Sequence, residues 1–406
     1  MVSIVIPVYN GANYMREAID SAIEQTWNNC EVIVVNDGST DSGETERIAL
    51  SYGDKIRYYS KKNGGVATAV NYGIEQMHGD YFAWLSHDDV FYKDKIEKQM
   101  NAILESGDPY AICHGNFDFL EMDSMKKTSV DWLSLYDKDQ LEDSCFAPLF
   151  LAIHGSTVLF HKYHFDRVGK YRTDLRATQD SEFLFRVMRG QKSVFVDSSL
   201  IIGRLHPEQG QRTMKCHKTE YNQMFVDFCE NLTDSEKIQM CGSVRNFYYH
   251  LWTILKSSEP ADTILDYLKS KMEESELPHD DIGDVHNICD LVFPGMNVDS
   301  SGVFIFGAGY YGKCMLEKLR MYEIPVEAFI DNDKNKWGKS IDGIPCCSVD
   351  RIKDDCNNPV VIIAVLADAN EIDNQLAQIG IKFVYRFKEI NRRLFKLLPV
   401  NCGLRR

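Results

Sequence analysis

The sequence predicts an α/β protein whose N-terminal part holds a parallel sheet covered by helices on both faces. The runs Val2–Val8 and Glu31–Asn36 are mostly apolar and rich in β-branched residues, as strands buried on both faces are. Between them, Asn13–Thr26 carries apolar residues at helical spacing, which predicts a helix packed on the sheet. Strand and helix continue to alternate through about the first hundred residues, and this alternation is typical of parallel sheets.

Length and composition narrow the class of protein. A chain of 406 residues is longer than one hydrophobic core usually serves, so two or three domains are expected. A formal net charge of -15 argues against a nucleic-acid partner bound through its phosphates. Twelve cysteines without a repeated CxxC frame indicate free thiols in a reducing cytoplasm. No window offers about eighteen uninterrupted apolar residues, so the sequence predicts no membrane span, and the apolar start is interpreted as a buried strand.

The chain divides into three predicted parts. Residues 1–215 form the first α/β domain, and the mixed pattern from about residue 109 to residue 202 is its second half. Residues 216–298 are helical, polar and poor in glycine, which favours a helical connector. Residues 299–406 form a second, smaller α/β unit that begins with the apolar strand Val303–Phe306.

The end of the chain is basic and amphipathic. Its basic residues, interleaved with leucine and phenylalanine, are Arg392, Arg393, Lys396, Arg405 and Arg406. A segment of this kind can lie on an anionic membrane surface, which would give peripheral contact with the inner face of the cell membrane. A helix docked on its own domain is the favoured alternative.

Polar residues follow the predicted strands at their carboxyl ends. Asp37–Asp41 follows the second strand, and Ser86–Asp89 follows the apolar strand Tyr81–Leu85. Ligands of doubly wound sheets bind outside the carboxyl ends of the strands, so these segments are expected to converge. The adjacent carboxylates of Asp88 and Asp89 should face different targets, one of them a Mg²⁺ or Mn²⁺ ion with its preference for oxygen ligands. The alternatives are a solvated turn for the acid pair and a helix cap for Asp37–Asp41.

Three segments in order resemble the nucleotide-binding half of family 2 glycosyltransferases of GT-A fold: Pro7–Asn10, Asn36–Asp41 and Ser86–Asp89. The resemblance covers about the first 210 residues. It implies an inverting transferase that moves a sugar from a nucleotide-diphosphate sugar, usually a UDP-sugar, to a hydroxyl acceptor. The implied setting is the synthesis of a bacterial surface glycan, with a glycan or a lipid-linked glycan as acceptor.

The same resemblance assigns the nucleotide contacts. It implies that Asp37 accepts a hydrogen bond from the base, while backbone around Pro7 and Tyr9 cradles base and ribose. Asp88 falls on the ribose side. Apart from the resemblance, the segment Lys62–Gly65 supplies a positive charge beside the cleft, and Lys62 would stabilise the leaving diphosphate. A solvated loop is the alternative for both Lys61 and Lys62.

The metal contacts also rest on the resemblance. It implies that Asp89 binds the Mn²⁺ or Mg²⁺ ion that bridges the two phosphates. Ser86 stands where many relatives carry an acid, so few protein ligands are expected. His206, in Arg204–Gln209, matches a segment where the family often places a metal-binding or phosphate-binding histidine, and a purely structural histidine is the alternative.

The chemistry needs a base, because the attacking hydroxyl releases a proton. Ala177–Phe183 resembles the acidic catalytic segment of the family, and Asp180 matches the base. Gln179, the residue before it, is often acidic in relatives. The alternative is that Asp180 and Glu182 only complement the positive end of a helix dipole.

A second nucleotide-like motif lies in the C-terminal part. Gly307, Gly309 and Gly312 follow a predicted strand and open a helix, and Asp331 lies about twenty residues further on, which together match the dinucleotide fingerprint. The surrounding sequence resembles small Rossmann-like domains attached to bacterial sugar-modifying enzymes, some of which bind nucleotide sugars. A domain kept for packing or for forming a homodimer is one alternative. A different class of function, an NAD-dependent oxidoreductase or a nucleotide sensor, is the other.

Overall fold

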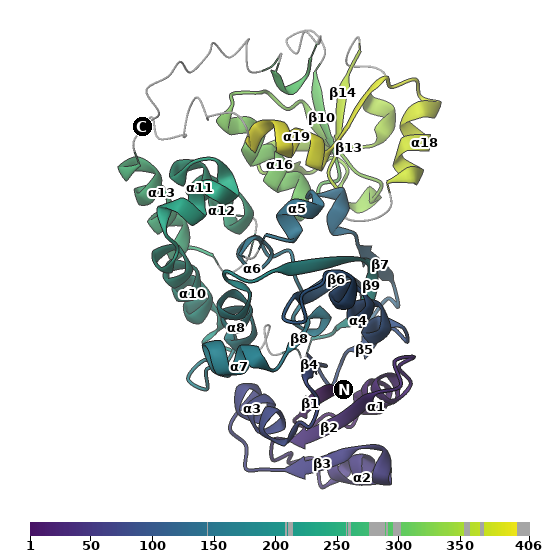
Figure 1. Ribbon diagram of the computed structural model, residues 1–406. Helices are drawn as coiled ribbons and strands as arrows, with labels where there is room; N and C mark the ends of the chain where they lie inside the picture. The colour runs from purple at the N-terminus through teal and green to yellow at the C-terminus, as the bar shows by residue number, and fades with distance from the viewer. Residues whose placement is uncertain are drawn as a thin grey trace. The chain divides into compact units, whose positions relative to one another are not determined.

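The computed structural model describes residues 1–143, 145–207, 209, 214–256, 258, 261–275, 289, 291–294, 302–352, 358–365 and 369–395. They fall into two compact units (Figure 1). The first comprises Met1–Val130 and Lys138–Phe228, and the second comprises Asp131–Asp137 and Cys229–Arg406. The domain boundaries expected after residues 215 and 298 stay predictions. No helix in the described ranges is long and apolar enough to cross a membrane.

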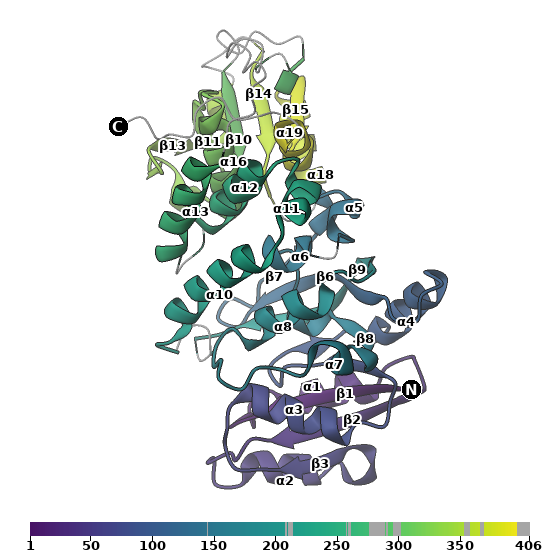
Figure 2. The same ribbon diagram turned by 60° about the vertical axis from the view of Figure 1, so that its left-hand side comes forward.

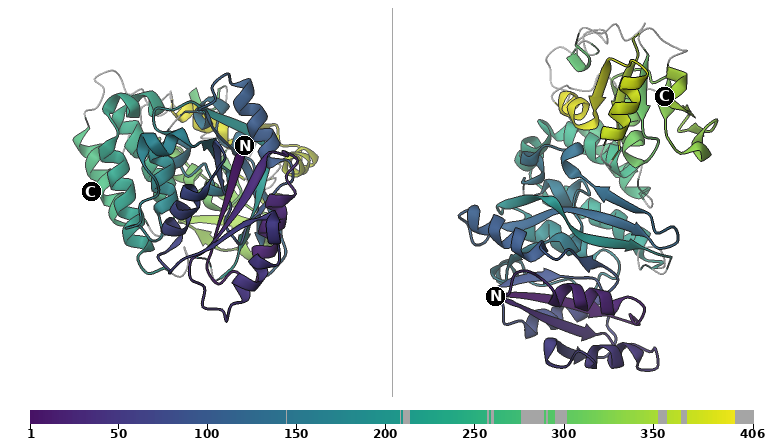
Figure 3. Two further views of the ribbon diagram at one scale, coloured as in Figure 1. Left: turned by 60° about the horizontal axis from the view of Figure 1, so that its bottom comes forward. Right: turned by 90° about the vertical axis from the view of Figure 1, so that its right-hand side faces the viewer.

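The sheet of the first unit begins with four parallel strands, which run side by side near the N-terminus (Figure 3). They are β1 (Val2–Val8), β2 (Cys30–Asn36), β3 (Arg57–Ser60) and β4 (Tyr81–Trp84), in the order β3-β2-β1-β4. Val2 pairs with both Cys30 and Tyr81, and the pairing of β1 with β2 ends at Val8 and Asn36. This register brings the carboxyl ends of the central strands to one edge.

The rest of this sheet is mixed. Beyond β4 the order continues as β8 (Leu159–His161), β6 (Ile112–Glu121), β9 (Ser193–Leu205) and β5 (Val90–Phe91), and β7 (Lys127–Val130) pairs with β6. β8 is antiparallel to β4 and to β6, whereas β6 and β9 are parallel. The predicted α/β class with a parallel N-terminal half is therefore confirmed.

Helices cover both faces of the parallel strands. The helix α1 (Met15–Ile23) lies on one face of β1 and β2, and α3 (Val66–Gln76) lies on the opposite face (Figure 2). The remaining helices of this unit are α2 (Glu44–Leu50), α4 (Lys95–Glu105), α5 (Lys138–Leu141), α6 (Phe146–Leu149), α7 (Tyr163–Val168), α8 (Gln179–Met188) and α10 (His217–Asn231) as far as Phe228.

The second unit holds a sheet in the order β12-β13-β11-β10-β14-β15. Its strands are β10 (Val303–Phe306), β11 (Ala328–Ile330), β12 (Ser340–Ile341), β13 (Ile344–Cys347), β14 (Val360–Ile363) and β15 (Phe383–Arg386). All are parallel except β12, which pairs antiparallel with β13. Its helices are α11 (Asp234–Cys241), α12 (Val244–Lys256), α13 (Thr263–Glu274), α16 (Tyr310–Met321), α18 (Asn370–Gln378) and α19 (Phe387–Phe395).

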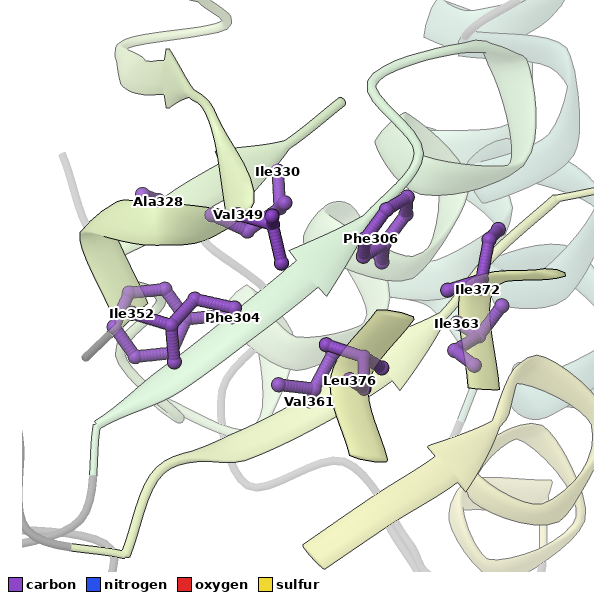
Figure 4. Close-up of a cluster of buried hydrophobic side chains, with 10 residues drawn as sticks. All are labelled: Phe304, Phe306, Ala328, Ile330, Val349, Ile352, Val361, Ile363, Ile372 and Leu376. Carbon is purple, nitrogen blue, oxygen red and sulfur yellow. The ribbon is translucent and has the colours of Figure 1, made fainter. Parts of the chain in front are cut away.

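The core of this sheet follows the strand period of two. Alternate residues of β10, β11 and β14 face one layer, where two residues of α18 pack on them (Figure 4). The cluster consists of Phe304, Phe306, Ala328, Ile330, Val349, Ile352, Val361, Ile363, Ile372 and Leu376. Burial of this continuous apolar layer is what holds the unit together.

The described part of the basic C-terminal segment packs on its own unit. Phe387, Ile390 and Leu394 of α19 are buried, and Arg392 forms an ion pair with Asp137 at 3.1 Å. The favoured alternative, a docked helix, is thereby confirmed for α19. Lys396, Arg405 and Arg406 lie outside the described residues, and membrane contact stays a prediction.

Candidate functional site

Three segments continue past the ends of neighbouring strands in the first unit. The backbone N–H of Asp37 donates to Val8 at 2.8 Å, that of Lys61 to Asn36 at 2.9 Å and that of Leu85 to Val5 at 3.0 Å. These hydrogen bonds hold the segments after β2, β3 and β4 together at the carboxyl edge of the sheet. The predicted convergence of the motifs is therefore present.

Asp37 is buried and fully engaged by a loop that follows β3. Its carboxylate accepts hydrogen bonds from the Lys61 Nζ at 2.6 Å, from the Gly64 N–H at 3.0 Å and from the Gly65 N–H at 2.7 Å. Lys61 is thus the lysine that contacts Asp37. The side chain of Lys62, predicted to stabilise the leaving diphosphate, is exposed. In this arrangement Asp37 orders the loop 61–65, so direct contact with a base would require the loop to yield one of these hydrogen bonds.

The segment after β1 is shaped by local hydrogen bonds. Pro7 lies buried within the strand, and Tyr9 beyond it is 44% exposed. Asn10 adopts a left-handed conformation at φ 51° and accepts from the Thr40 N–H at 2.7 Å. This conformation links the end of β1 to the segment 36–41 and leaves the ring of Tyr9 free to meet a ligand.

Asp41 takes the structural role that was the alternative for its segment. Its carboxylate accepts from the Thr45 N–H at 3.0 Å and from the Thr45 hydroxyl at 2.6 Å, at the first turn of α2. Because Asp41 caps a helix while Asp37 faces the loop, the two acids of this motif serve different purposes.

Asp88 pairs with His206. The Asp88 Oδ2 lies 3.1 Å from the His206 Nε2, and the ring of Tyr14 lies 5.1 Å from that of His206. Burial opposes ionisation of Asp88, but the electrostatic interaction with His87 and hydrogen bonds from Ser86 and His206 outweigh it, so the pKa of Asp88 is lowered. Asp88 is therefore an ionised carboxylate beside an imidazole.

Asp89 faces the opposite way and is buried. Its Oδ1 accepts from the backbone N–H of Arg204 at 3.2 Å, and its Oδ2 accepts from the Ser156 hydroxyl at 3.4 Å. Burial, followed by repulsion from Asp88, raises its pKa well above the ordinary value. The two adjacent carboxylates thus face different partners, as expected, but the one beside His206 is Asp88.

Arg204 holds the acid pair against the end of β9. Its guanidinium donates to the backbone carbonyl of Asp88 at 2.7 Å and forms an ion pair with Glu17 of α1 at 2.5 Å. It also lies 5.1 Å above the ring of Tyr14. Sequence reasoning named Arg204 only as the start of a segment, since nothing local signals that a strand-end arginine reaches across to another turn.

Asp88 and His206, with the His206 Nε2 deprotonated, could together hold a divalent cation that keeps most of its positions for other ligands. One carboxylate oxygen and one imidazole nitrogen lie 3.1 Å apart. No set of three or more histidine, cysteine, aspartate or glutamate residues suited to a metal is found among the described residues. Mg²⁺ commonly binds through one or two carboxylates together with substrate phosphates and water, and two protein donors suffice for such an ion.

Asp180 lies in the first turn of α8. Its Oδ1 accepts from the Ser181 N–H at 2.9 Å, and burial raises its pKa. A Cβ atom at Gly155 would lie 3.8 Å from the Asp180 Oδ2. Because Ser156, the next residue, donates to Asp89, the turn Gly155–Thr157 connects the predicted base with the acid pair.

Glu220 is a residue that sequence reasoning missed. It belongs to α10, and its carboxylate accepts from the backbone N–H groups of Arg176, Ala177 and Thr178, directly before the helix that carries Asp180. Its separation from Arg176 is 44 residues, so no local pattern announces the contact.

The second motif lies at the carboxyl edge of the other sheet. Gly307 follows β10 at φ 104°, Gly309 caps α16, and a Cβ at Gly312 would lie 1.8 Å from the Gly307 carbonyl oxygen. Asp331 follows β11, where its carboxylate accepts from the Ala308 N–H at 2.8 Å. It also accepts from the Asp333 N–H at 2.9 Å and from the Lys336 Nζ at 2.8 Å. The acid that would bind a ribose is thus occupied within the protein.

Comparison with protein families matches two parts of the chain. The model described as glycosyl transferase family 2 matches residues 3–169. A model described as C2185-like, N-terminal, matches residues 300–384.

Curated relatives match up to about two thirds of the chain. An uncharacterised glycosyltransferase of Rickettsia felis is 43% identical over 260 residues, which are 64% of this chain and 43% of that protein. One from Rickettsia typhi is 42% identical over 258 residues, which are 64% of this chain and 80% of that protein. Glycosyltransferase GlyA of Streptococcus pneumoniae is 35% identical over 151 residues, 37% of this chain and 21% of that protein. The chain therefore spans less than half the length of some of these relatives and most of the length of another.

Among solved structures, S. aureus TarS 1-349 in complex with UDP-GlcNAc gives a TM-score of 0.47 at 14% identity, over 67% of this chain and 88% of that chain. A TM-score of this size does not by itself establish a shared fold.

Proposed function

We propose that this chain, which belongs to glycosyl transferase family 2, transfers a sugar from a nucleotide-diphosphate sugar to a hydroxyl group of an acceptor. The observation that supports this most is the arrangement of acids at one sheet edge. The pair Asp88 and His206 lies after β4 and β9, and the turn Gly155–Thr157 connects Asp89 with Asp180. A transferase of this class needs both a site for the diphosphate and a base, and this edge offers candidates for each.

The donor is proposed to lie along the carboxyl ends of β1 and β2. Pro7 and Tyr9 border the position of base and ribose, and Asp37 keeps the loop 61–65 in place beside it. A UDP-sugar is the first donor to test, since uracil offers one N–H donor and two acceptors to the polar groups of this loop. The exposed Lys62 adds positive charge to this loop, which favours a diphosphate.

We propose that Asp88 and His206, rather than the predicted Asp89, hold the Mn²⁺ or Mg²⁺ ion. Such an ion, when bound, neutralises charge on the departing diphosphate. Asp89 instead fixes the turn through Arg204 and Ser156. This division follows from the burial of Asp89 and from the 3.1 Å separation of Asp88 and His206.

Asp180 is proposed as the general base. The acceptor oxygen forms the new bond to the anomeric carbon as the bond from that carbon to the diphosphate oxygen breaks, with inversion. The acceptor proton passes to the Asp180 carboxylate, and the nucleoside diphosphate leaves with the bonding electrons. Because burial raises the pKa of Asp180, its carboxylate is a better proton acceptor than an exposed aspartate.

The acceptor is proposed to be a glycan or lipid-linked glycan of the bacterial surface, with the reaction taking place in the cytoplasm. The described cysteines are free thiols, in keeping with a reducing compartment.

For the second unit we propose a doubly wound, Rossmann-like fold whose glycines serve helix–strand packing. The oxidoreductase alternative has little support, because Asp331 is already hydrogen-bonded within the protein.

The test is the release of nucleoside diphosphate from a panel of UDP-, GDP- and dTDP-sugars, with Mn²⁺, Mg²⁺ or chelator, first with water and then with glycan acceptors. Selective release from one donor class supports the proposal. No release from any donor, together with an absorbance change when NAD(H) is supplied with candidate substrates, would replace it with the oxidoreductase alternative.

A further inference from the structure

The first turn of α10 holds the segment that precedes Asp180. The Glu220 carboxylate lies 3.0 Å from the backbone nitrogen of Arg176, 2.9 Å from that of Ala177 and 3.3 Å from that of Thr178. Burial opposes ionisation of Glu220, but these N–H groups and the Cys216 thiol outweigh it, so its pKa is lowered. Three successive N–H groups therefore share one ionised carboxylate, and they lose their partner if it is removed.

Arg176 connects the same segment to the loop beside Asp37. Its Nη1 donates to the Gly64 carbonyl at 2.6 Å, and a Cβ at Gly65 would lie 2.7 Å from that nitrogen. Gly64 and Gly65 are the residues whose N–H groups donate to Asp37. The Arg176 side chain thus contacts a carbonyl group of the loop whose N–H groups donate to Asp37.

These contacts form a continuous chain of hydrogen bonds from Asp37, through the loop 61–65 and Arg176, to Glu220. We infer that Glu220 and Arg176 are positioning residues that fix Asp180 relative to the donor loop, so that donor and base are held in one frame. The inference rests on the proposed function, because it assigns these residues a purpose in that reaction. Neither residue is required to touch the substrate.

The chemical consequence concerns the surroundings of Asp180. The titratable groups that face it are Tyr171 and, from α10, His217. Burial is the largest cause of the raised pKa of Asp180, and the segment 176–178 leads directly into α8, the helix that carries this carboxyl. If that segment loosens, water reaches the carboxyl and its pKa falls toward the ordinary value. A displacement of about 1 Å can also cost about 100-fold in rate.

The experiment measures donor turnover with water or acceptor for wild type, Glu220→Ala, Glu220→Gln, Arg176→Ala and Arg176→Lys. Glu220→Ala should lower kcat about 10- to 100-fold, leave the donor KM within about twofold, and move the acid limb of the pH profile to lower pH. Glu220→Gln, which keeps one acceptor oxygen, should fall between Glu220→Ala and wild type. Arg176→Ala should lower kcat and also raise the donor KM, and Arg176→Lys should restore part of both.

The matched control is Arg172→Ala, which removes an exposed arginine four residues before Arg176 whose ion-pair partner is Asp174. It should behave as wild type. If wild type turns over a donor while both Glu220 variants keep its kcat and its acid limb, the inference is wrong and the proposed function stands. If Glu220→Ala does not fold, the Glu220→Gln variant alone decides. A Glu220→Gln enzyme with the kcat and the acid limb of wild type would overturn the inference. If wild type turns over no donor, the proposed function fails and the inference fails with it.

Discussion

The two sheets carry the same local arrangement at their carboxyl edges but differ in what surrounds it. Asp37 after β2 and Asp331 after β11 each accept hydrogen bonds from two backbone N–H groups and one lysine. The donors are Gly64, Gly65 and Lys61 in the first case, and Ala308, Asp333 and Lys336 in the second. In both units, therefore, an acid at a strand end fixes the conformation of a glycine-containing loop.

The difference lies in the neighbouring elements. In the first unit, β4 and α8 bring Asp88, Asp89 and Asp180 to the edge, and β9 adds His206. In the second unit, the glycine-containing loop that Asp331 holds follows β10 and continues into α16. Among the described residues, no such group of acids with a histidine has been found beside it. An acid that holds a loop at a strand end is therefore a structural feature that both units share. The additional ionisable groups of the first unit are what make its sheet edge the candidate catalytic site.

The largest effect is expected for Asp180→Asn. Loss of the proposed base should reduce kcat about 10²- to 10⁴-fold, while nucleotide binding measured by titration calorimetry stays close to wild type. Asp333→Asn, an exposed acid of the second unit, is the control and should not change kcat. An Asp180→Asn enzyme with normal turnover would show that Asp180 is not the base. The main difference between the sheet edges of the two units would then be lost.

Next is a pair of glycine substitutions in the second unit. A Cβ at Gly312 would lie 1.8 Å from the Gly307 carbonyl, so Gly312→Ala should destabilise this unit by about 3 kcal/mol or more. Gly309 has no atom within 4 Å of the corresponding position, and Gly309→Ala should leave thermal unfolding nearly unchanged. If instead the wild-type protein bound a nucleotide and Gly309→Ala abolished that binding, the carboxyl edge of the second unit's sheet would be a ligand site.

Asp88→Asn should weaken Mn²⁺ binding about 100-fold, measured by the electron paramagnetic resonance of free Mn²⁺ in the presence of nucleoside diphosphate. Asp89→Asn should bind Mn²⁺ nearly as wild type does, because its carboxyl faces Arg204 and Ser156. If Asp89→Asn weakened Mn²⁺ binding and Asp88→Asn did not, the metal would belong to Asp89, as the sequence first suggested.

Asp37→Asn and Asp331→Asn should each cost about 1–3 kcal/mol in denaturant unfolding, since buried N–H donors lose a carboxylate. Only Asp37→Asn should also weaken donor binding. A loss of donor affinity in Asp331→Asn, with Asp37→Asn unaffected, would exchange the roles of the two edges.

The smallest effects are those of pH. Burial raises the pKa of Asp180, so kcat/KM should fall on the acid side at a pH above 3.8, the ordinary aspartate value. For Asp331 burial opposes ionisation, but Lys336 and two N–H groups outweigh it and lower the pKa. Its stabilising contribution is therefore fully present above pH 3.8 and is lost as the pH falls through the lower, folded-state pKa. An acid limb at or below pH 3.8 would contradict the first expectation.

Much of the fold was predictable because its signals are local. The apolar runs of β1, β2 and β4 and the stripe of α1 identify a parallel sheet with covering helices. The convergence of Asp37, Asp88 and Asp89 at one edge then follows from the rule that parallel strands share their carboxyl ends.

What sequence could not determine depends on contacts between distant segments. Lys61 and Lys62 are chemically identical neighbours, and only the course of the loop decides that Lys61 meets Asp37. Likewise, the choice between Asp88 and Asp89 depends on β9, more than a hundred residues away. Glu220 carried no signal at all, since its role is set by backbone N–H groups 42 to 44 residues earlier.

The most direct test is a crystal structure of the full chain grown with a nucleoside diphosphate and Mn²⁺, in which anomalous scattering locates the ion. We expect a Mn²⁺ peak bound by Asp88 and His206, with the nucleotide along the carboxyl ends of β1 and β2. A nucleotide at Gly307–Gly309, with no ion beside Asp88, would contradict it.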